Sequence, residues 1–592
     1  MADEMIFEIE DGVLVKYNGG EVAVVPEGVE RIGAYSFIGN DTVRKVVIPS
    51  GVTCIEQQAF RGCDSLSEVV LPSGLEAIER FAFCSCGQLK DITIPETVTE
   101  IGNSAFRGCD LISGVSLPKG LKRLGESAFS DCRSLESAVV SGTVGVIRKR
   151  TFSGCRAMKE LTVGEGITLI DDYAFECCSS LEEAKLPDSV NAIGHFAFRG
   201  CSSLVKAVVP ESVEHIGSGA FENTPIVSKF ADDAVVLGNG VLVKWCCETE
   251  NITVPEGVRV VGENAFSSLS QLKSVSLPET VVEISDLAFE KCTELETVIL
   301  PQSLKIIGDR AFVDCTSLAG IKLPGNVKRI GSDAFYNTML LESHNEDTVI
   351  LDSKYLIRCS VNSESFTVPD GVVLIADNAF AGAVGVQEIT FAPTVKYIGN
   401  NAFRWLGSLK KAVIPDSVES IGSDAFMACT DLDVTLSMKG KTLGNSVFPS
   451  TSRVTFICGE KRFTVRLEDA LSGNDPIALF AQCPCADSFC AISSLNEKVP
   501  AAVCFTDEIK ECDEFLAENI ADALCYAVVS DDMPLLTALL ETDKADATSL
   551  DKAIDRSMSD DALEFRVKLM DKKRLLLNGK SLDSVIDDMF SI

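Results

Sequence analysis

A phenylalanine recurs every 23 residues through most of this chain, and this period constrains the fold more than any other feature. A fixed period of about 20 to 50 residues is typical of stacked coils, each of which packs only against its neighbours. We therefore predict a solenoid rather than several globular domains. The repeat phenylalanines are Phe37, Phe60, Phe83, Phe106, Phe129, Phe152, Phe175, Phe198, Phe221, Phe266, Phe289, Phe312, Phe335, Phe380, Phe403, Phe426 and Phe448.

The other repeat positions predict how each coil is built. Most units read Ile-Gly-x-x-Ala-Phe-x-x-Cys-x-x-Leu-x-x-Val-x-Leu-Pro, as in residues 101–118 and 307–324. Apolar and variable residues alternate at the end of the Leu-x-x-Val-x-Leu segment, and this alternation predicts a short strand with one buried face. The proline that follows cannot donate to a strand ladder and ends the strand. The Ile-Gly pair permits a second bend.

Cysteine follows the same period. Ten of the 23 cysteines lie three residues after a repeat phenylalanine: Cys63, Cys86, Cys109, Cys132, Cys155, Cys178, Cys201, Cys292, Cys315 and Cys429. We interpret this as a packing position, because free cysteine behaves as a small buried apolar residue. A ladder of thiols would mispair in an oxidising compartment, so the pattern predicts a reducing one.

Composition excludes several classes of protein and partner. The net charge of −34 leaves no basic stripe for nucleic acid or for an anionic membrane surface, so we expect neither partner. No apolar run approaches the roughly 20 residues of a membrane span. The acidic start, residues 1–5, does not resemble a secretion signal, which predicts a cytoplasmic protein. We expect a monomer, and the acidic charge favours a basic partner.

The repeat resembles the BspA-type leucine-rich repeat, whose consensus has the same strand and the same Ile-Gly-x-x-Ala-Phe-x-x-Cys segment. The resemblance covers residues 26 to about 457 and includes 17 units. It implies an α+β, mostly β fold, namely a leucine-rich-repeat solenoid with a parallel sheet on the concave side and the Ala-Phe segments on the convex side. It also suggests a bacterial or protist source.

The period is interrupted twice, between Phe221 and Phe266 and between Phe335 and Phe380, where successive repeat phenylalanines are 45 residues apart instead of 23. Residues 240–244 and 355–358 echo residues 12–17, where Asn18-Gly19-Gly20 predicts the turn of a hairpin. We therefore divide the chain into an N-terminal capping hairpin (1–25), repeat block 1 (26–228), a hairpin with block 2 (229–343), a hairpin with block 3 (344–462) and a helical domain (463–592).

The C-terminal segment predicts paired amphipathic helices. Residues 520–529 and 534–540 show apolar spacing near 3.6 residues, and residues 550–554 and 565–570 form a similar pair. The pairs weakly resemble degenerate ankyrin repeats, although Thr-Pro-Leu-His is missing. Two interpretations stay open, a helical cap on the last repeat and a second binding module.

The sequence shows no pattern of an enzyme or of a cofactor site. The three histidines lie in no nucleophile motif, and no Walker loop, dinucleotide glycine pattern or His-Glu-x-x-His is present. Cys483, Cys485, Cys490 and Cys504 form a cluster whose irregular spacing does not suit zinc. We therefore predict a non-enzyme without cofactor or metal.

The most favoured function is a non-catalytic scaffold that binds a protein partner through its concave strands. The candidate contact residues follow the repeat leucine: Arg44, Lys45, Glu68, Lys90, Asp91, Glu136, Lys159, Glu160, Glu182, Glu183 and Lys185. They are mixed in charge and include no row of aromatic anchors, so the sequence predicts no hot spot. The alternative is a cell-surface adhesin for host matrix or cell-surface molecules, which the family resemblance suggests.

Overall fold

The structure is a computed structural model of the 592-residue chain. It describes residues 6–90, 92–228, 233–344, 346–467, 469–482, 484, 486–506, 508–530, 532–557 and 562–578. The chain forms two compact units, Met1–Val327 with Asp333–Ser343, and Lys328–Ser332 with His344–Ile592. We call them unit 1 and unit 2 and describe each by itself.

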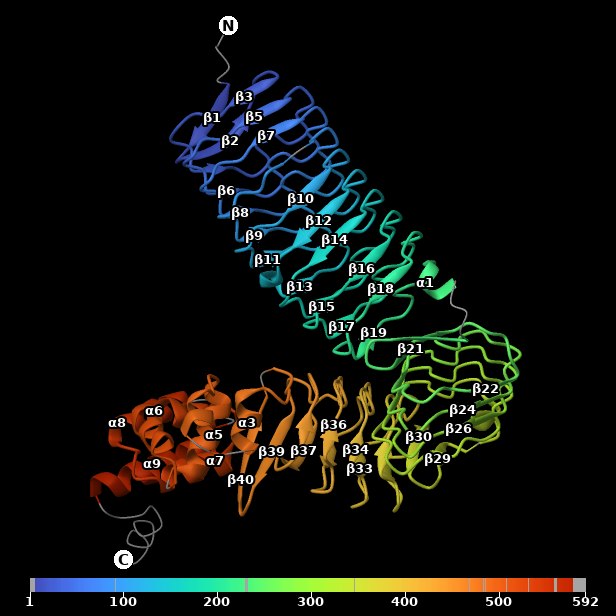
Figure 1. The fold of residues 1–592 in the computed structure, drawn as a ribbon. Helices are drawn as coiled ribbons and strands as arrows, with labels where there is room; N and C mark the ends of the chain where they lie inside the picture. The colour runs from blue at the N-terminus through green and yellow to red at the C-terminus, as the bar shows by residue number, and fades with distance from the viewer. Residues whose placement is uncertain are drawn as a thin grey trace, which may run out of the picture. The chain divides into compact units, whose positions relative to one another are not determined.

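Most regular coils carry two short strands, and most of these strands pair in parallel with a counterpart 23 residues away in the chain. Figure 1 shows the two rows of strands running along the coils. In the longer row, Val46 pairs with Val69 and both side chains are buried, while the residues on either side face outward. The solenoid of about 19 turns and the parallel pairing are confirmed. The placement of the longer row on the concave side stays a prediction.

The second row was not predicted. The sequence indicated only a bend at the Ile-Gly pair, but the isoleucine and the residue before it form a two-residue strand such as β6 (Cys54–Ile55). The isoleucine faces the core, because Ile55 and Ile78 are fully buried. The bend follows directly after this strand, so both features fit within four residues.

Unit 1 contains both rows over the first two repeat blocks. Its longer strands are β3 (Val22–Val24), β5 (Lys45–Val47), β7 (Glu68–Val70), β10 (Gly114–Ser116), β12 (Ser137–Val140), β14 (Glu160–Val163), β16 (Glu183–Lys185), β18 (Lys206–Val208), β22 (Asn251–Thr253), β24 (Ser274–Ser276) and β26 (Thr297–Ile299). Its second row is formed by β4 (Arg31–Ile32), β6, β8 (Ala77–Ile78), β9 (Glu100–Ile101), β11 (Arg123–Leu124), β13 (Val146–Ile147), β15 (Leu169–Ile170), β17 (Ala192–Ile193), β19 (His215–Ile216), β23 (Val260–Val261), β25 (Glu283–Ile284) and β27 (Ile306–Ile307). The short helices are η1 (Gly142–Val144), α1 (Pro225–Ser228) and α2 (Met339–Glu342).

Unit 2 continues the same design and ends in helices. The longer row consists of β31 (Ser365–Thr367), β33 (Glu388–Thr390), β35 (Lys411–Val413), β37 (Asp433–Ser437), β39 (Arg453–Cys458) and β40 (Lys461–Arg466). The second row consists of β32 (Leu374–Ile375), β34 (Tyr397–Ile398), β36 (Ser420–Ile421) and β38 (Thr442–Leu443), and β28 (Arg329–Ile330) also belongs to this unit. The helices are α3 (Pro476–Gln482), α4 (Ala486–Cys490), α5 (Leu495–Phe505), α6 (Lys510–Val529), α7 (Met533–Glu541), α8 (Ala547–Arg556) and α9 (Leu563–Asn578).

A β-hairpin precedes each of the three runs of regular coils. The hairpins are β1 (Phe7–Glu10) with β2 (Val13–Tyr17), β20 (Ala234–Leu237) with β21 (Val241–Trp245), and β29 (Thr348–Leu351) with β30 (Tyr355–Cys359). All three carry an irregularity at the same place in the first strand, which marks them as copies of one element. In each hairpin the second strand pairs in parallel with the first regular coil that follows.

The predicted turn of the first hairpin was wrong. The turn lies at Asp11-Gly12, where φ is 46° and 76°, as a two-residue type I′ turn requires. Asn18-Gly19-Gly20 instead leads from β2 to β3, which pair with different partners. The Tyr17 hydroxyl donates hydrogen bonds to the carbonyls of Gly20 (2.9 Å) and Val22 (3.2 Å) and holds this connection in place.

The repeat phenylalanines form a buried stack, as predicted. Successive rings from Phe37 to Phe221 lie with centroids 4.6 to 5.7 Å apart, and each of these side chains is at most 1% exposed. Tyr17 and Trp245 occupy the place of the phenylalanine in two hairpins and stack on Phe37 (4.8 Å) and Phe266 (5.6 Å). Offset stacking adds about 0.5 to 1.5 kcal/mol per pair to the burial of each ring.

The ten cysteines of the repeat do more than fill space. Each thiol donates a hydrogen bond to the carbonyl of the phenylalanine 26 residues earlier, for example Cys63 to Phe37 at 3.0 Å and Cys132 to Phe106 at 3.2 Å. The bond joins consecutive coils and satisfies a buried carbonyl, which alanine would leave unpaired. Burial raises the pKa of Cys109, Cys132 and Cys155 well above the usual thiol range, and raises the pKa of Cys429 to about 12.

The Ala-Phe segments stack through a second hydrogen-bond ladder, which we call the back ladder. In most regular coils the N–H groups two residues before, at and two residues after the phenylalanine donate to carbonyls of the next coil. Gln58, Phe60 and Gly62 do so at 3.0, 2.7 and 2.8 Å. The first and last of these residues have positive φ, 58° for Gln58 and 70° for Gly62, which turns all three N–H groups to the same side. The back ladder therefore has a direction, with donors always facing the following coil.

The C-terminal helices cover the end of the solenoid in unit 2. Strand β40 turns back antiparallel on β39 instead of opening another coil, and α3 and α5 pack on this hairpin. Phe463 of β40 lies 6.0 Å from Phe480 of α3 and 6.3 Å from Phe505 of α5, measured between ring centroids. The helical segment is confirmed and includes a cap, whereas the resemblance to ankyrin repeats is not confirmed. Strand β40 extends past residue 462, where the third block was predicted to end.

The phenylalanine stack generates a stability prediction. Phe129→Ala should cost about 3 to 5 kcal/mol, because it leaves a cavity between two rings in mid-array. Since coils stabilise only their neighbours, thermal unfolding should split into two transitions. Phe81→Ala, which truncates a half-buried ring outside the stack, is the control and should melt close to the parent protein. A single unchanged transition for Phe129→Ala in calorimetry would contradict the role of the stack.

The thiol pKa values generate a second prediction. Because burial raises the pKa of Cys109 and Cys155, these thiols stay protonated at pH 8 and should resist iodoacetamide in the native protein. The exposed Cys177, Cys246 and Cys490 should be alkylated first. Mass spectrometry of peptides from native and denatured samples measures both sets. Rapid native labelling of Cys109 or Cys155 would show that the coils open or that these thiols are not buried.

Candidate binding surface

The outward side chains of the longer strands form a continuous surface in each unit, which we call the ladder face. It is built by the alternation of the strands, since Val46 and Val69 point into the core and the residues on both sides of them point out. Parallel pairing places equivalent residues of neighbouring coils side by side, so each repeat position runs as a lane along the solenoid. In unit 1 this face carries almost all the predicted contact residues.

Cross-strand ion pairs connect the charged lanes of the ladder face. Lys45 lies 2.7 Å from Glu68, and Lys159 lies 3.5 Å from Glu136, each pair being formed between predicted residues. Both members of each pair are 41% to 61% exposed. Exposed pairs of this kind contribute about 0.2 to 1 kcal/mol each, so they arrange the surface more than they stabilise the fold.

Two ion-pair partners were missed by the sequence analysis. Glu21 lies 3.6 Å from Arg44, and Lys206 lies 2.7 Å from Glu183. Each partner stands 23 residues from the predicted residue, so adding or subtracting one period would have found it. The same pairing recurs outside the predicted set, as Lys273 with Glu250 in unit 1 and Lys411 with Glu388 in unit 2. The Glu250 carboxylate raises the pKa of the Lys273 ammonium.

The remaining predicted residues lie singly on or beside the same strands. Glu160 opens β14 and Lys185 ends β16, and both are exposed. Glu182 directly precedes β16, and its backbone carbonyl accepts a hydrogen bond from the N–H of Val205 (3.0 Å). Lys90 is exposed and belongs to a coil without a strand in this row. Asp91 lies outside the described residues.

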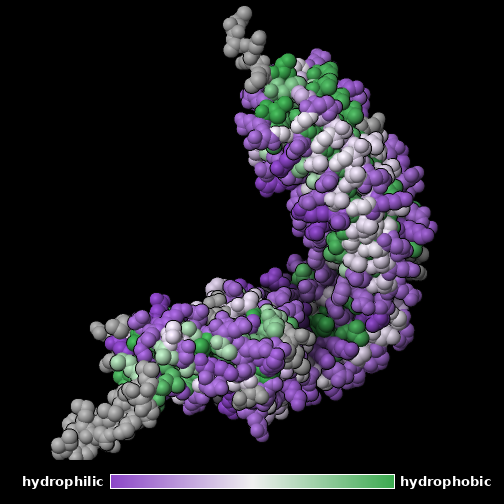
Figure 2. All heavy atoms as spheres, turned by 90° about the vertical axis from the view of Figure 1, so that its left-hand side faces the viewer, coloured by the Kyte–Doolittle hydropathy of each residue, from purple (hydrophilic) through white to green (hydrophobic). Residues whose placement is uncertain are grey.

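Exposed valines recur at intervals in one lane of the ladder face, where Thr93, Ser116, Thr162 and Lys185 occupy the same position in other coils. Val24, Val70, Val139 and Val208 occupy the same repeat position and are 61%, 43%, 45% and 39% exposed. Apolar side chains also gather at the N-terminal end of the solenoid in Figure 2, where Ile6, Val22 and Val24 are each more than half exposed. A partner can therefore bury branched apolar side chains while its charged groups meet the neighbouring lanes.

Among the described residues, the structure shows no group of three or more His, Cys, Asp or Glu side chains arranged to hold a metal ion. Of the predicted cluster, Cys490 is exposed and Cys504 is half-buried, while Cys483 and Cys485 lie outside the described residues. In the part of the chain that is described, no helix is both long and apolar enough to cross a membrane.

Coils that stack through parallel strands and each bury apolar residues at the same repeat positions are characteristic of leucine-rich-repeat solenoids. The BspA type leucine rich repeat region matches residues 30–157, 124–235, 238–359 and 349–474 of the sequence. These matches span well over half of the chain, so the protein belongs to the BspA-type leucine-rich repeat family.

Solved structures of bacterial leucine-rich repeat proteins are similar to this chain. A leucine-rich repeat protein from Bacteroides ovatus shares 26% identity over 70% of this chain and 93% of that chain, with a TM-score of 0.38. A leucine rich cell surface protein from Faecalibacterium prausnitzii shares 22% identity over 72% and 91% of the two chains, with a TM-score of 0.31. Among curated proteins, none matches the chain.

The ion-pair lanes generate a prediction about their energy. A double-mutant cycle of Lys45→Ala and Glu68→Ala should give a coupling of no more than about 1 kcal/mol, because both side chains are exposed. The coupling should shrink further in 0.5 M salt, because the Debye length falls to about 4 Å. Chemical denaturation of the four proteins measures it. A salt-independent coupling well above that range would show that the pair is a structural part of the coil.

Proposed function

We propose that this protein is a non-catalytic scaffold that recognises a protein partner through the ladder face. The observation that carries the proposal is the juxtaposition of paired charged lanes with the exposed valines. Most of these side chains lie on strands that pair with at least one neighbouring strand, so little conformational freedom is lost when a partner binds. The scaffold then presents a fixed pattern instead of a flexible one.

The chemistry of the partner follows from the two kinds of lane. The exposed valines favour a partner with apolar side chains at intervals along one line, and the lanes beside them favour alternating charge. The net charge of −34 adds a long-range attraction for a basic partner. The surface supplies no aromatic hot spot, so affinity must be distributed over several coils.

Photo-cross-linking tests which face binds. A benzophenone amino acid is placed at Val139, on the ladder face, and at Arg107, whose side chain lies at an Ala-Phe segment and is 54% exposed. In the native cell, the Val139 variant should cross-link to a discrete protein partner that the Arg107 variant does not capture. The reverse pattern, or equal capture from both positions, would reject the ladder face as the binding surface.

Charge reversal then tests the residues themselves. With the partner identified, Glu160→Lys, Glu182→Lys and Glu183→Lys together should weaken binding at least tenfold, about 1.4 kcal/mol, in a titration at low salt. Reversal of three exposed acids away from the ladder face supplies the matched control for net charge: Asp64→Lys, Glu126→Lys and Glu214→Lys. Equal losses for the two triple variants would assign the effect to overall charge.

The working compartment is part of the proposal. The ten repeat thiols each hold a coil-to-coil hydrogen bond, and their oxidation during folding would break this ladder, which supports a reducing, cytoplasmic compartment. Fractionation of the source cells with an antibody against the chain checks this. Protein found at the cell surface would favour the adhesin alternative over the intracellular scaffold.

A further inference from the structure

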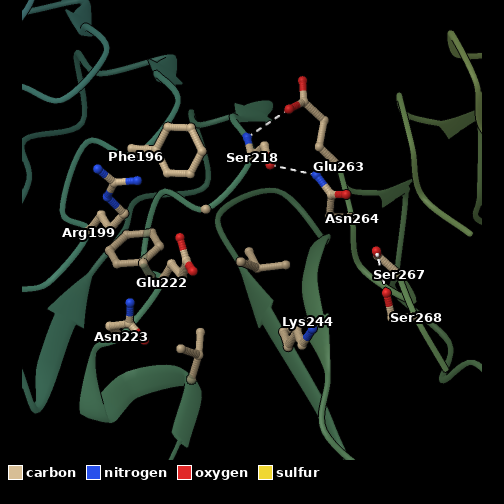
Figure 3. A pocket seen from close by; sticks show the side chains of 14 residues that line it. Phe196, Arg199, Ser218, Glu222, Asn223, Lys244, Glu263, Asn264, Ser267 and Ser268 are labelled. Atoms are coloured by element: carbon tan, nitrogen blue, oxygen red, sulfur yellow. Dashed lines mark hydrogen bonds between the residues drawn. The ribbon is translucent and has the colours of Figure 1, made fainter. Parts of the chain in front are cut away.

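Unit 1 contains a cavity of about 660 Å³ at the second hairpin, between the coil of residues 217–224 and the coil of residues 262–268. We call it the junction slot, and Figure 3 shows its two walls. The hairpin β20–β21 stands between these coils but has no Ala-Phe segment, so one rung of the back ladder is missing here. Strand β21 contributes Val243 and Lys244 to the lining.

One wall of the slot carries unpaired backbone donors. In the preceding coil, the N–H groups of Phe196, Phe198 and Gly200 donate to Ser218, Ala220 and Glu222 at 2.9, 2.7 and 2.8 Å. The equivalent donors of the next coil are the N–H groups of Gly219, Phe221 and Asn223. None of these three has a hydrogen-bond partner among the described residues, and all three residues line the slot.

The opposite wall carries the matching acceptors. In a regular coil, three backbone carbonyls accept hydrogen bonds from the N–H groups of the preceding coil. The equivalent carbonyls in the coil of Phe266 belong to Glu263, Ala265 and Ser267. Trp245 donates to Ala265 at 2.9 Å, whereas no described residue donates to the carbonyls of Glu263 and Ser267.

Side chains close one end of the slot and make part of its lining apolar. The N–H of Ser218 donates to the Glu263 carboxylate at 2.7 Å, and the Asn264 amide donates to the Ser218 hydroxyl at 2.6 Å (Figure 3). These two bonds bridge coils that are two repeats apart. The apolar lining comes from Phe196, Phe221, Val227 and Val243.

We propose that the junction slot binds an extended peptide segment of a partner protein, which replaces the missing rung of the back ladder. The segment would accept hydrogen bonds from one wall, donate to the carbonyls of Glu263 and Ser267 on the other, and place an apolar side chain against Phe196, Val227 and Val243. The site is separate from the ladder face and does not depend on the function proposed for that face.

Two observations favour a peptide over a free anion. A row of backbone N–H groups also suits carboxylate or phosphate, but the facing carbonyls need donors, which an anion lacks and a peptide supplies. The slot also has the volume of a ligand pocket, about 300 to 1,000 Å³. The charged side chains at the slot, Arg199 and Lys244 with Glu222 and Glu263, balance one another.

Hydrogen exchange tests whether the slot is open. In the free protein, the amides of Gly219, Phe221 and Asn223 should exchange faster than the paired amides of Phe196, Phe198 and Gly200, which form the matched control within the same fold. Mass spectrometry with residue-level fragmentation measures the ratio. Equal protection of the two sets would overturn the proposal, because it would mean that the donors are already satisfied.

A peptide copied from a regular coil of this chain tests binding. The probe is acetyl-Asn-Ser-Ala-Phe-Arg-Gly-amide, the sequence of residues 103–108, and the control is a scrambled peptide of the same composition. In a Trp405→Phe protein the remaining tryptophan, Trp245, directly follows Lys244 of the slot and reports binding by fluorescence. The probe should bind saturably, with a Kd between about 1 μM and 1 mM, and should protect the amides of Gly219, Phe221 and Asn223.

A blocking variant assigns the binding to the slot. Ser267→Tyr places a large side chain in the slot, and the fold accepts it because Tyr336 occupies the corresponding position after Phe335. Ser153→Tyr is the matched control, since Ser153 and Ser267 occupy the same repeat position and contact Glu176 and Glu290 at 3.3 and 3.4 Å. Both variants should melt alike, and only Ser267→Tyr should lose probe binding, at least tenfold.

The remaining outcomes also decide the proposal. No saturable binding of the probe, or equal binding to both tyrosine variants, would overturn it. Protection of the three amides by sodium phosphate alone would identify an anion site instead of a peptide site. Probe binding should be unchanged in the triple charge reversal of Glu160, Glu182 and Glu183, so a failure of the ladder face and a failure of the slot are distinguishable.

Discussion

The backbone N–H and C=O groups of each coil in this solenoid find their hydrogen-bond partners in the neighbouring coils, and the rest of the structure depends on this requirement. The strand rows meet it with ordinary parallel pairing. The Ala-Phe segments meet it with alternating backbone conformations that turn all donors one way, and the thiols add one bond per coil. A buried donor or acceptor without a partner costs about 1 to 3 kcal/mol, so an array of such coils is stable only where each end is covered.

The ends are covered in two different ways. At the N-terminus and inside the chain, a hairpin supplies a parallel partner to the first strand of the following coils but only one donor to their Ala-Phe segment, as Trp245 does for Ala265. At the C-terminus, β40 reverses the sheet and the helices bury its end behind Phe463, Phe480 and Phe505. A hairpin in mid-chain is therefore an incomplete cap, and the junction slot is the consequence of this incompleteness.

The period made the fold and the core predictable from sequence. Phe, Ala and Cys repeat because each has one environment in all coils, and the structure buries them as expected. The hairpin turn was misassigned because Asn18-Gly19-Gly20 and Asp11-Gly12 are both strong turn sequences, and only the pairing of β1 with β2 decides between them. The ion-pair partners Glu21 and Lys206 could have been predicted from the period, because residues 23 apart are neighbours in a parallel sheet with this repeat length. The slot was predictable only in part: the 45-residue interval between Phe221 and Phe266 shows that one Ala-Phe segment is absent, but the pairing of the backbone groups on either side depends on how the hairpin packs.

The two candidate surfaces differ in what fixes their specificity. On the ladder face, side chains vary from coil to coil while the backbone is saturated, so recognition there depends on the lanes of charge and valine and can change by substitution alone. In the junction slot the backbone itself is unsaturated, so recognition depends on the position of the hairpin. Lengthening a block by whole 23-residue units would extend the ladder face without altering the slot. Repeat duplication can thus enlarge one binding surface while the geometry of the other stays constant.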